Sequence, residues 1–278
     1  MAKNRLCIVT HTFLPHVGGI EIVTNEQSKR LQNKNYSPLI VTNRIGTPPK
    51  YSVDGVPVEC YESFNAGFRL GIPYSIPTVG SFPVFARNVK KCQLLHAHGH
   101  PYLTSLLAGK LAKIYAKPFV LTQHNTFIEY NNIFDQVELL NDLSVGKQNL
   151  EAADKIIAIS EATKQYVLRL GAKSSKVKVI YNGVDTQRFG VIKGKKEEMR
   201  RKLGIPQNAA VVLTVRRLVY KNGVDTLLEC ANIVIKKNPK IVFVAVGKGP
   251  DMESVRQQAE QLGIAANFRL AGFVSDAD

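Results

Sequence analysis

The chain has 278 residues, 45% of which are hydrophobic, and its 37 Lys and Arg against 22 Asp and Glu give a net charge of +15. This length suits two domains with sizeable cores, and the apolar runs are far shorter than the roughly 20 residues of a membrane-spanning helix. Because His11 and Pro15 interrupt the N-terminal apolar stretch, it does not resemble a secretory signal, so we expect a cytoplasmic protein.

A glycine pair follows the first predicted strand, at 5–10. Gly18 and Gly19 open a predicted helix whose first turn contains Glu21. Glycines let backbone N–H groups approach a bound anion, and a helix N-terminus attracts negative charge. A tight turn that binds no ligand is an alternative explanation of the glycine pair, because short glycine motifs are common in proteins. Since motifs at other strand ends favour the same chemistry, we predict a diphosphate contact at this pair.

Strands and helices alternate through the first part of the chain. Leu103, Leu107 and Leu111 form one apolar stripe, which predicts a helix between two of the strands. Such alternation predicts an α/β fold with a parallel sheet covered by helices on both faces. The strand-like runs, rich in β-branched residues, are 5–10, 37–42, 92–97, 118–122, 155–159 and 177–181.

Residues 64–91 interleave aromatic and cationic side chains, among them Phe64, Phe82, Arg87 and Lys90. Aromatics beside cations suit a membrane interface or a lipid-linked substrate. A proline-rich loop packed on a core explains the same letters. The net positive charge attracts nucleic acid, phosphosugars or an acidic membrane leaflet and does not choose among them.

Three histidines, His96, His98 and His100, alternate at the end of the third predicted strand. Alternate positions share one strand face, so these imidazoles raise the possibility of a zinc site. Gly99 and Pro101 break that geometry, and no acidic or cysteine partner is near in sequence. We therefore expect no metal here and keep His98 as a ligand-contact candidate.

Further polar residues follow the next strands. His124 is interpreted either as a structural histidine or as a contact to a substrate hydroxyl or phosphate. Ser160 is either the N-cap of the following helix or a ligand contact, and Asn182 closes the first unit in "YNGVD". The carboxyl ends of parallel strands meet at one edge, where open α/β sheets bind ligands. We therefore expect these candidates to cluster there.

A second strand–helix pattern follows a polar, basic connection at about 186–208. It predicts a second Rossmann-like unit, which has few strands for an open sheet and reads as unfinished. Two such units facing each other would form a cleft, and we predict domains at 1–190 and 191–278. The predicted strands are 211–215, 241–246 and 267–271, and the predicted helices are 224–236 and 251–262.

Cationic side chains follow the first predicted strand of this second unit, at 211–215. Arg216, Arg217 and Lys221 would neutralise a diphosphate, with a solvent-facing basic loop as the alternative. Gly247 and Gly249 follow the next strand but lack the third glycine of a dinucleotide fingerprint. An NAD enzyme is therefore disfavoured.

The motifs together resemble glycosyltransferase family 4, whose members are retaining enzymes of the GT-B fold. The segments that carry the resemblance, in order, are "FLPHVGGIE", "TQHNT", "ADKIIAIS", "YNGVDTQRF", "TVRRLVYKNGVDTLLECA", "VGKGPDMESVRQQAEQLGI" and "FRLAGFVSDAD". The resemblance implies two Rossmann-like domains facing across a cleft, the second incomplete here. It also implies a nucleotide-sugar donor, a glycan, lipid-linked or membrane-glycolipid acceptor, and no cofactor or required metal.

The resemblance also implies roles for single residues. By it, Gly19 contacts the donor diphosphate, His124 is the catalytic histidine near the reacting sugar, and Arg217 with Lys221 binds the donor phosphates. Gly247 lies in the donor-binding set, and 272–274 lies against the nucleotide base. The donor-binding residues by this reading are Gly18, Gly19, Arg217, Lys221, Gly247, Gly272, Phe273 and Val274, and the other cleft candidates are Glu21, His98, Ser160, Asn182 and Arg216.

Departures from the family pattern leave two other interpretations open. The family has Gly-Arg where this chain has Arg216-Arg217, and its lysine position is held by Asn222. Its paired-glutamate segment lies beyond Asp278. The alternatives are an inactive truncated fragment of such an enzyme and a non-catalytic basic module that binds membrane or nucleic acid. The main reading expects no nucleic acid and allows a peripheral place on the inner face of the membrane.

Overall fold

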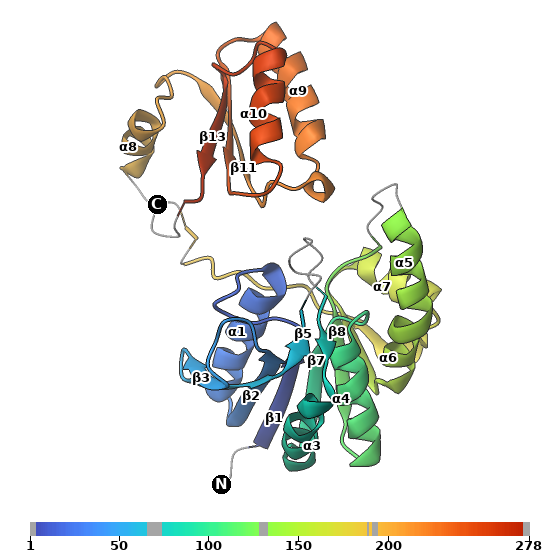
Figure 1. Cartoon of the computed structure of the whole chain (residues 1–278). Helices are drawn as coiled ribbons and strands as arrows, with labels where there is room; N and C mark the ends of the chain where they lie inside the picture. Colours follow the sequence, from blue (N-terminus) through green and yellow to red (C-terminus); the bar gives the residue numbers. More distant parts are fainter. Residues whose placement is uncertain (1–3, 66–73, 128–132, 188, 191–193, 275–278) are drawn as a thin grey trace. The chain divides into compact units, whose positions relative to one another are not determined.

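The computed structural model describes residues 4–65, 74–127, 133–187, 189–190 and 194–274. The chain divides into two compact units, Met1–Gly183 and Val184–Asp278. Each unit is an α/β layer structure built on its own sheet (Figure 1). Within the described residues, no helix is both long and apolar enough to cross a membrane.

The N-terminal unit contains an eight-stranded sheet with the order β10-β9-β8-β7-β1-β2-β4-β3. Neighbouring strands are parallel except for β3 and β4, which form an antiparallel pair. A separate antiparallel ribbon joins β5 (Ser63–Phe64) and β6 (Ile76–Pro77). The strands of the sheet are β1 (Asn4–Thr10), β2 (Tyr36–Asn43), β3 (Lys50–Val53), β4 (Val56–Tyr61), β7 (Leu94–His98), β8 (Phe119–Gln123), β9 (Lys155–Ala158) and β10 (Val177–Val179).

Helices cover this sheet on both faces (Figure 1). Successive side chains of a strand point to opposite faces, and β1 shows the consequence. Cys7 and Val9 join the core beneath α3 and α4, whereas Leu6 and Ile8 join a second core on the other face. The helices are α1 (Gly19–Gln32), α3 (Phe82–Lys91), α4 (Leu103–Ile114), α5 (Ile133–Asn141), α6 (Lys147–Ala152) and α7 (Glu161–Arg169), with short turns η1 (Val79–Ser81), η2 (Asp142–Gly146, a π-helix) and η3 (Ser174–Lys176).

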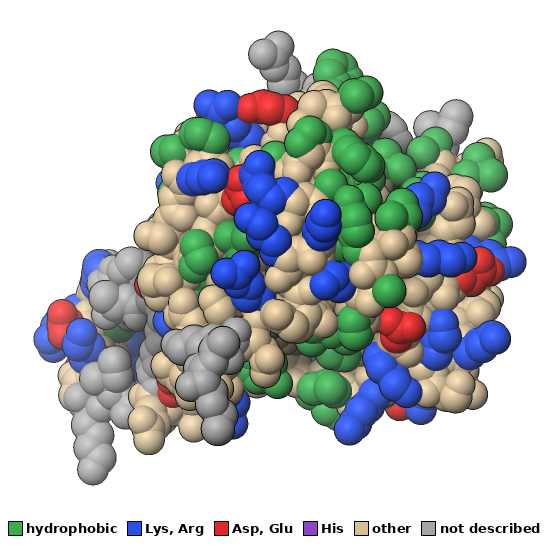
Figure 2. All heavy atoms as spheres, turned by 90° about the horizontal axis from the view of Figure 1, so that it is seen from below, with side chains coloured by type: hydrophobic (Ala, Val, Ile, Leu, Met, Phe, Trp, Pro, Cys, Tyr) green, Lys and Arg blue, Asp and Glu red, His purple; other side chains and the backbone are tan. Residues whose placement is uncertain are grey.

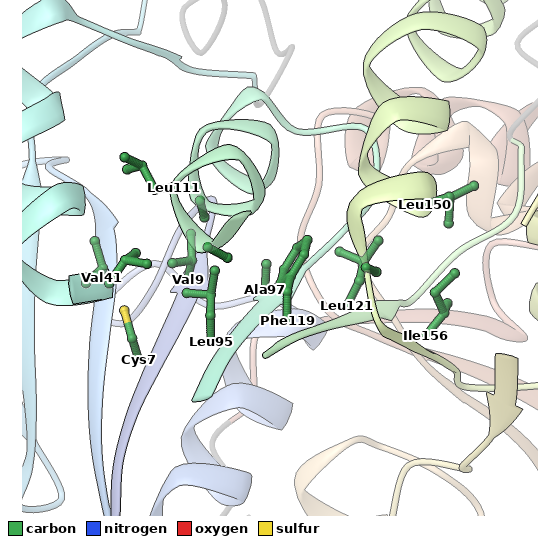
Figure 3. Close-up of a cluster of buried hydrophobic side chains, with 14 of the residues drawn as sticks. Cys7, Val9, Val41, Leu95, Ala97, Leu111, Phe119, Leu121, Leu150 and Ile156 are labelled. Carbon is green, nitrogen blue, oxygen red and sulfur yellow. The ribbon is translucent and has the colours of Figure 1, made fainter. Parts of the chain in front are cut away.

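The larger core runs across the middle strands (Figure 3). Leu95 and Ala97 of β7, Phe119 and Leu121 of β8, and Ile156 of β9 are all buried there. Buried strands of this kind read as continuous apolar runs, which is why the sequence indicates them clearly. The rigid sheet fixes where the loops at its carboxyl edge begin.

The C-terminal unit is a three-stranded parallel sheet with the order β11-β12-β13. Leu228 of α9, Val255 of α10 and Phe243 of β12 pack in its main core. β11 lies at an edge of the sheet, and its Leu213 and Val215 are 60% and 72% exposed. The elements are α8 (Lys195–Lys202), β11 (Ala210–Val215), η4 (Tyr220–Asn222), α9 (Val224–Lys237), β12 (Ile241–Val246), α10 (Met252–Gln261) and β13 (Phe268–Gly272).

The segment 64–91 differs from its interpretation as a loop. Residues 66–73 lie outside the described part of the chain, whereas Phe82–Lys91 forms α3. Phe85 and Val89 of this helix are buried in the main core. Proline at the start of a helix is tolerated because the first N–H groups have no partner within the helix, so Pro83 does not prevent α3 from forming.

Candidate active site

The strand order of the N-terminal sheet reverses between β1 and β7. Open α/β sheets bind ligands beyond the carboxyl ends of their strands at such a point. The loops after Thr10 and His98 begin there, and β8 is the next strand beside β7. The predicted residues Gly18, Gly19 and His124 stand on the segments that follow β1 and β8.

The glycine pair opens α1, as predicted. Gly18 is the N-cap, with φ of −154°, and Gly19 is the first helical residue. A Cβ atom at Gly18 would lie 2.4 Å from Oε2 of Glu21, whereas a Cβ at Gly19 would meet nothing within 4 Å. Thr12 donates a hydrogen bond to Oε1 of the buried Glu21. A Cβ atom at position 18 would therefore displace the end of the Glu21 side chain, which Thr12 holds, and the open side of the helix N-terminus is at Gly19.

Histidines at the carboxyl ends of two neighbouring strands, β7 and β8, lie against one another. Nδ1 of His98 is 2.8 Å from Nε2 of His124, and the ring centroids of His96 and His98 are 4.4 Å apart. Nε2 of His96 is 2.7 Å from Oγ1 of Thr122. The structure thus brings together the two histidines, His98 and His124, that the sequence selected separately.

Burial keeps these imidazoles neutral. It lowers the pKa of His96 to about 4, with a smaller effect from His124, and lowers the pKa of His124 to about 4. The pKa of His98 is well below its ordinary value because the ring is buried and faces the other two histidines. Among the described residues, no group of three or more His, Cys, Asp or Glu side chains is placed to hold a metal ion.

An aromatic stack beside β1 was not predicted. The ring of His11 stacks on Tyr102, with centroids 4.2 Å apart and planes 7° from parallel. Nδ1 of His11 is 3.2 Å from Oγ of Ser75. Gly99 has φ of +86°, and a Cβ atom there would lie 2.4 Å from the ring of Tyr102. The signal available in the sequence was that His11 follows β1 directly, as His124 follows β8.

His100 belongs to a different cluster from His98. Its Nε2 is 2.9 Å from Oδ1 of Asp142, and both side chains are 2% exposed. Tyr166 donates a hydrogen bond to Oδ2 of Asp142, and burial followed by this carboxylate raises the pKa of Tyr166 above its ordinary value. A Cβ atom at Gly146 would lie 2.6 Å from Cδ2 of His100. This cluster joins the loop after β7 to η2 and α7.

Ser160 and Asn182 have separate surroundings. Ser160 is the N-cap of α7, and its hydroxyl accepts a hydrogen bond of 3.1 Å from the N–H of Thr163. That capping bond confirms the structural alternative for Ser160 and leaves its ligand contact as a prediction. Asn182 is exposed and lies after the end of β10.

Two glycines after β12 allow close contact between the loops of the C-terminal unit. A Cβ atom at Gly247 would lie 2.0 Å from the carbonyl oxygen of Arg216, and one at Gly249 would lie 1.9 Å from that of Leu218. The N–H of Leu218 also donates to the carbonyl oxygen of Lys248 at 3.1 Å. Only residues without a side chain fit these positions, so the loops after β11 and β12 pack directly against each other at the carboxyl edge of the sheet. We call this surface, formed by residues 216–218 and 247–249, the ledge.

The paired arginines on this ledge differ in their contacts. Arg216 donates to Oγ1 of Thr214 at 2.8 Å and to the carbonyl oxygen of Asn222. The exposed guanidinium of Arg217 has no partner within the described part of the chain. Arg216 therefore stabilises its own loop through hydrogen bonds, whereas the guanidinium of Arg217 is available to bind a ligand. Lys221 lies in η4, and its side chain is outside the described residues.

The end of β13 completes the ledge. Gly272 has φ of +70°, and its carbonyl oxygen accepts a hydrogen bond of 2.7 Å from the N–H of Gly247. Phe273 follows with 73% of its side chain exposed, and Val274 is half-buried. The structure thus places the predicted residues Gly247 and Gly272 in direct contact.

Two family models match the chain in succession. The model described as Glycosyltransferase Family 4 matches residues 17–188, and the model described as Glycosyl transferases group 1 matches residues 195–278. The chain belongs to glycosyltransferase family 4. This assignment confirms the resemblance that the ordered motifs indicated. The first match covers most of the N-terminal unit of this family 4 chain, and the second lies within its C-terminal unit.

Curated relatives of this family 4 chain are distant. It is 24% identical to the uncharacterized glycosyltransferase MJ1069 of Methanocaldococcus jannaschii, over 93% of this chain and 67% of that protein. It is 25% identical to a phosphatidylinositol N-acetylglucosaminyltransferase subunit of Arabidopsis thaliana, over 98% of this chain and 58% of that protein. The chain therefore spans roughly three fifths to two thirds of the length of these relatives.

A solved structure confirms the fold of this family 4 chain. The crystal structure of Anabaena Alr3699/HepE in complex with UDP and glucose aligns with a TM-score of 0.72 and 19% identity. The alignment covers 98% of this chain and 70% of that chain. The expected GT-B-like α/β architecture, with two Rossmann-like units, is thereby confirmed.

Proposed function

We propose that this chain is the donor- and acceptor-binding part of a retaining glycosyltransferase, which moves a sugar from a nucleotide-diphosphate sugar to a glycan or lipid acceptor. The observation that carries the proposal is the succession of the two family matches, at 17–188 and 195–278. The proposal is also supported by predicted residues that follow parallel strands in each unit, because open α/β sheets bind ligands beyond the carboxyl ends of such strands.

The C-terminal unit would bind the donor. Arg217 offers a guanidinium that pairs with none of the described residues, and such a group can hold two phosphate oxygens at once. The glycines at 247 and 272 let backbone approach backbone, and the exposed Phe273 offers a surface for a nucleotide base. Donor binding is supported by the similar fold of the Anabaena protein, which was solved with UDP and glucose.

The N-terminal unit would bind the acceptor and assist the reaction. His124 is assigned to the reacting sugar, and the N-terminus of α1 at Gly19 is assigned to the diphosphate. The carboxylate of Glu21 already lies on the inner side of that helix turn. An anion would therefore approach from the open side at Gly19, away from this negative charge.

The proposed step breaks the bond from the anomeric carbon to the diphosphate oxygen. The acceptor oxygen bonds to the same carbon on the same face, and its proton passes to the leaving diphosphate. Negative charge develops on the leaving oxygen, and N–H groups or cations that contact the diphosphate would lower the barrier. In this scheme the reaction requires neither a cofactor nor a metal.

A lipid or glycan acceptor at the cytoplasmic face of a membrane fits the charge of the chain. Lys and Arg side chains are spread over the face shown in Figure 2, with few Asp and Glu among them. Anionic lipids attract such surfaces. The relationship to the phosphatidylinositol N-acetylglucosaminyltransferase of Arabidopsis thaliana supports a lipid acceptor.

The donor assignment is tested by calorimetric titration with UDP-glucose and UDP-N-acetylglucosamine. Arg217→Gln should weaken donor binding about tenfold or more, because a charged hydrogen bond contributes about 1.5–3 kcal/mol. Arg201→Gln removes the same charge from an exposed position of α8 and should change the affinity less than about twofold. Equal weakening by both variants would contradict a specific role for Arg217.

Transfer is tested with the same donors carrying radiolabelled sugar. Lipid extracts and soluble glycans serve as separate acceptor pools. Label in the lipid phase supports the lipid acceptor, and label only in soluble glycan contradicts it. Donor binding without transfer to either pool would refute the transferase assignment for this chain.

A further inference from the structure

His98 and His124 are joined across two adjacent strands. β7 ends at His98, whose Cα pairs with Thr122 of β8, and His124 follows two residues later. Nδ1 of His98 is 2.8 Å from Nε2 of His124, and the ring planes are 26° from parallel. The contact is therefore fixed by the register of the sheet.

A hydrogen bond between two neutral imidazoles has only two arrangements. Either Nδ1 of His98 carries the proton and donates to His124, or Nε2 of His124 carries it and donates to His98. Both rings are neutral near pH 7, because burial lowers the pKa of each below its ordinary value. The arrangement determines which nitrogen of His124 holds a proton.

The surroundings of Nε2, the second ring nitrogen of His98, distinguish the two arrangements. Nε2 of His98 is buried and has no hydrogen-bond partner among the residues that the structure describes, and the side chain is 0% exposed. In the first arrangement this atom is an unpaired acceptor, and in the second it is an unpaired N–H donor. Buried donors without a partner are rarer than under-satisfied acceptors, so the first arrangement is favoured.

We propose that His98 is a positioning residue that holds His124 as its Nδ1–H tautomer, by donating its own Nδ1–H to Nε2 of His124. Within the described part of the chain, Nδ1 of His124 has no partner. This N–H is then available to donate to an oxygen acceptor, such as a sugar hydroxyl or a phosphate oxygen. The role of that donor rests on the proposed function, whereas the tautomer does not.

The unchanged chain gives the first test. Proton–nitrogen correlation spectra of ¹⁵N-histidine-labelled protein at pH 7.5 distinguish Nδ1–H from Nε2–H imidazoles, and single substitutions of the six histidines assign the signals. We expect the Nδ1–H form for both His98 and His124. An Nε2–H form of either ring overturns the proposal.

Variants of His98 give the second test. His98→Asn places a side-chain NH₂ near the position of Nδ1–H and should keep His124 in the Nδ1–H form. His98→Phe keeps a ring but removes the donor, and should shift His124 to the Nε2–H form. His96→Gln, which changes a neighbour bonded to Thr122, should leave the His124 tautomer unchanged. Retention of the Nδ1–H form in the Phe variant overturns the proposal.

Activity separates this proposal from the proposed function. If transfer is observed, kcat should fall about tenfold or more in the Phe variant, because His124 then no longer donates its Nδ1–H hydrogen bond, and should be largely restored in the Asn variant. If no transfer is observed while His124 is in the Nδ1–H form, the proposed function fails and the tautomer assignment stands. Equal kcat in the Phe variant and the unchanged chain overturns the positioning role.

Discussion

At the scale of single residues, the N-terminal unit contains buried polar side chains, several of which lie against a polar partner. Asp142 accepts from Tyr166 and faces His100, and His96 lies beside Thr122. Buried polar groups are costly without partners, so their partners determine both stability and chemistry. Sequence reasoning selected His98 and His124 from their positions at strand ends. It missed Asp142, because its contacts with His100 and Tyr166 join distant parts of the chain and leave no local signal.

The buried histidines should make the N-terminal unit sensitive to acid. Their folded pKa values lie below the ordinary value of 6.5, at about 4 for His96 and His124. The unfolded chain therefore binds protons that the folded chain does not. The stability that these rings contribute is complete above about pH 6.5 and is lost as pH falls toward 4, at about 1.4 kcal/mol per pH unit for each.

Urea unfolding at pH 7, 6 and 5 measures this effect. The slope of the unfolding free energy against pH gives the number of protons taken up on unfolding, and His96→Gln should reduce that number by about one between pH 7 and pH 5. A free energy of unfolding that is the same at pH 7 and pH 5 would show that the histidines are not held neutral.

Removal of the carboxylate of Asp142 should strongly destabilise the N-terminal unit. Asp142→Ala leaves buried His100 and Tyr166 without their shared partner, and each buried polar group left unsatisfied costs about 1–3 kcal/mol. Glu151→Ala, at an exposed position of α6, should cost less than about 0.5 kcal/mol. Chemical denaturation measures both, and similar small losses would contradict a stabilising role for the cluster.

At the scale of elements, the predicted strands and helices of both units are largely confirmed. The strand expected at 241–246 is β12, and the helix expected at 224–236 is α9. β3 and β4 were missed, because they are short and flank a turn at Asp54 and Gly55 rather than forming long apolar runs. α3 was missed because its proline and aromatic residues lie in a proline-rich segment that resembles a loop.

The ledge of the C-terminal unit depends on Gly247. Gly247→Ala places a Cβ atom 2.0 Å from the carbonyl oxygen of Arg216 and should destabilise this unit by more than about 3 kcal/mol. Gly263 also has a positive φ, of +70°, but a Cβ atom there would meet nothing within 4 Å. Gly263→Ala should therefore reduce the stability of the unit by only about 1–2 kcal/mol. Thermal unfolding compares the two, and equal losses would show that the steric contact is unimportant.

At the scale of the whole molecule, charge is the property that the sequence establishes most directly. The chain has 37 Lys and Arg against 22 Asp and Glu. Each cation that lies near an anionic membrane contributes about 1 kcal/mol to the free energy of membrane binding. We expect the chain to co-sediment with vesicles that contain phosphatidylserine and not with pure phosphatidylcholine. Binding should fall strongly between about 0.05 M and 0.5 M NaCl, because salt screens exposed charges.

Two outcomes would contradict this membrane prediction. Equal binding to both vesicle types would show that charge does not direct it. Tighter binding to DNA than to anionic vesicles at the same salt concentration would favour the basic-module alternative and a nucleic-acid partner.

The sequence by itself determined the fold class, the family and the positions of Gly18, Gly19, His124 and Arg217 at element ends. These depend on local patterns, since apolar runs mark strands and glycines mark turns. Tertiary structure alone decided which of them touch and which are free. The register of β7 with β8 joins His98 to His124. The fold of the loop after β11 engages Arg216, whereas the guanidinium of Arg217 has no partner among the described residues. The histidine contact joins residues 26 positions apart, and the Arg216 contact depends on how its loop folds back on itself, so no local pattern encodes either.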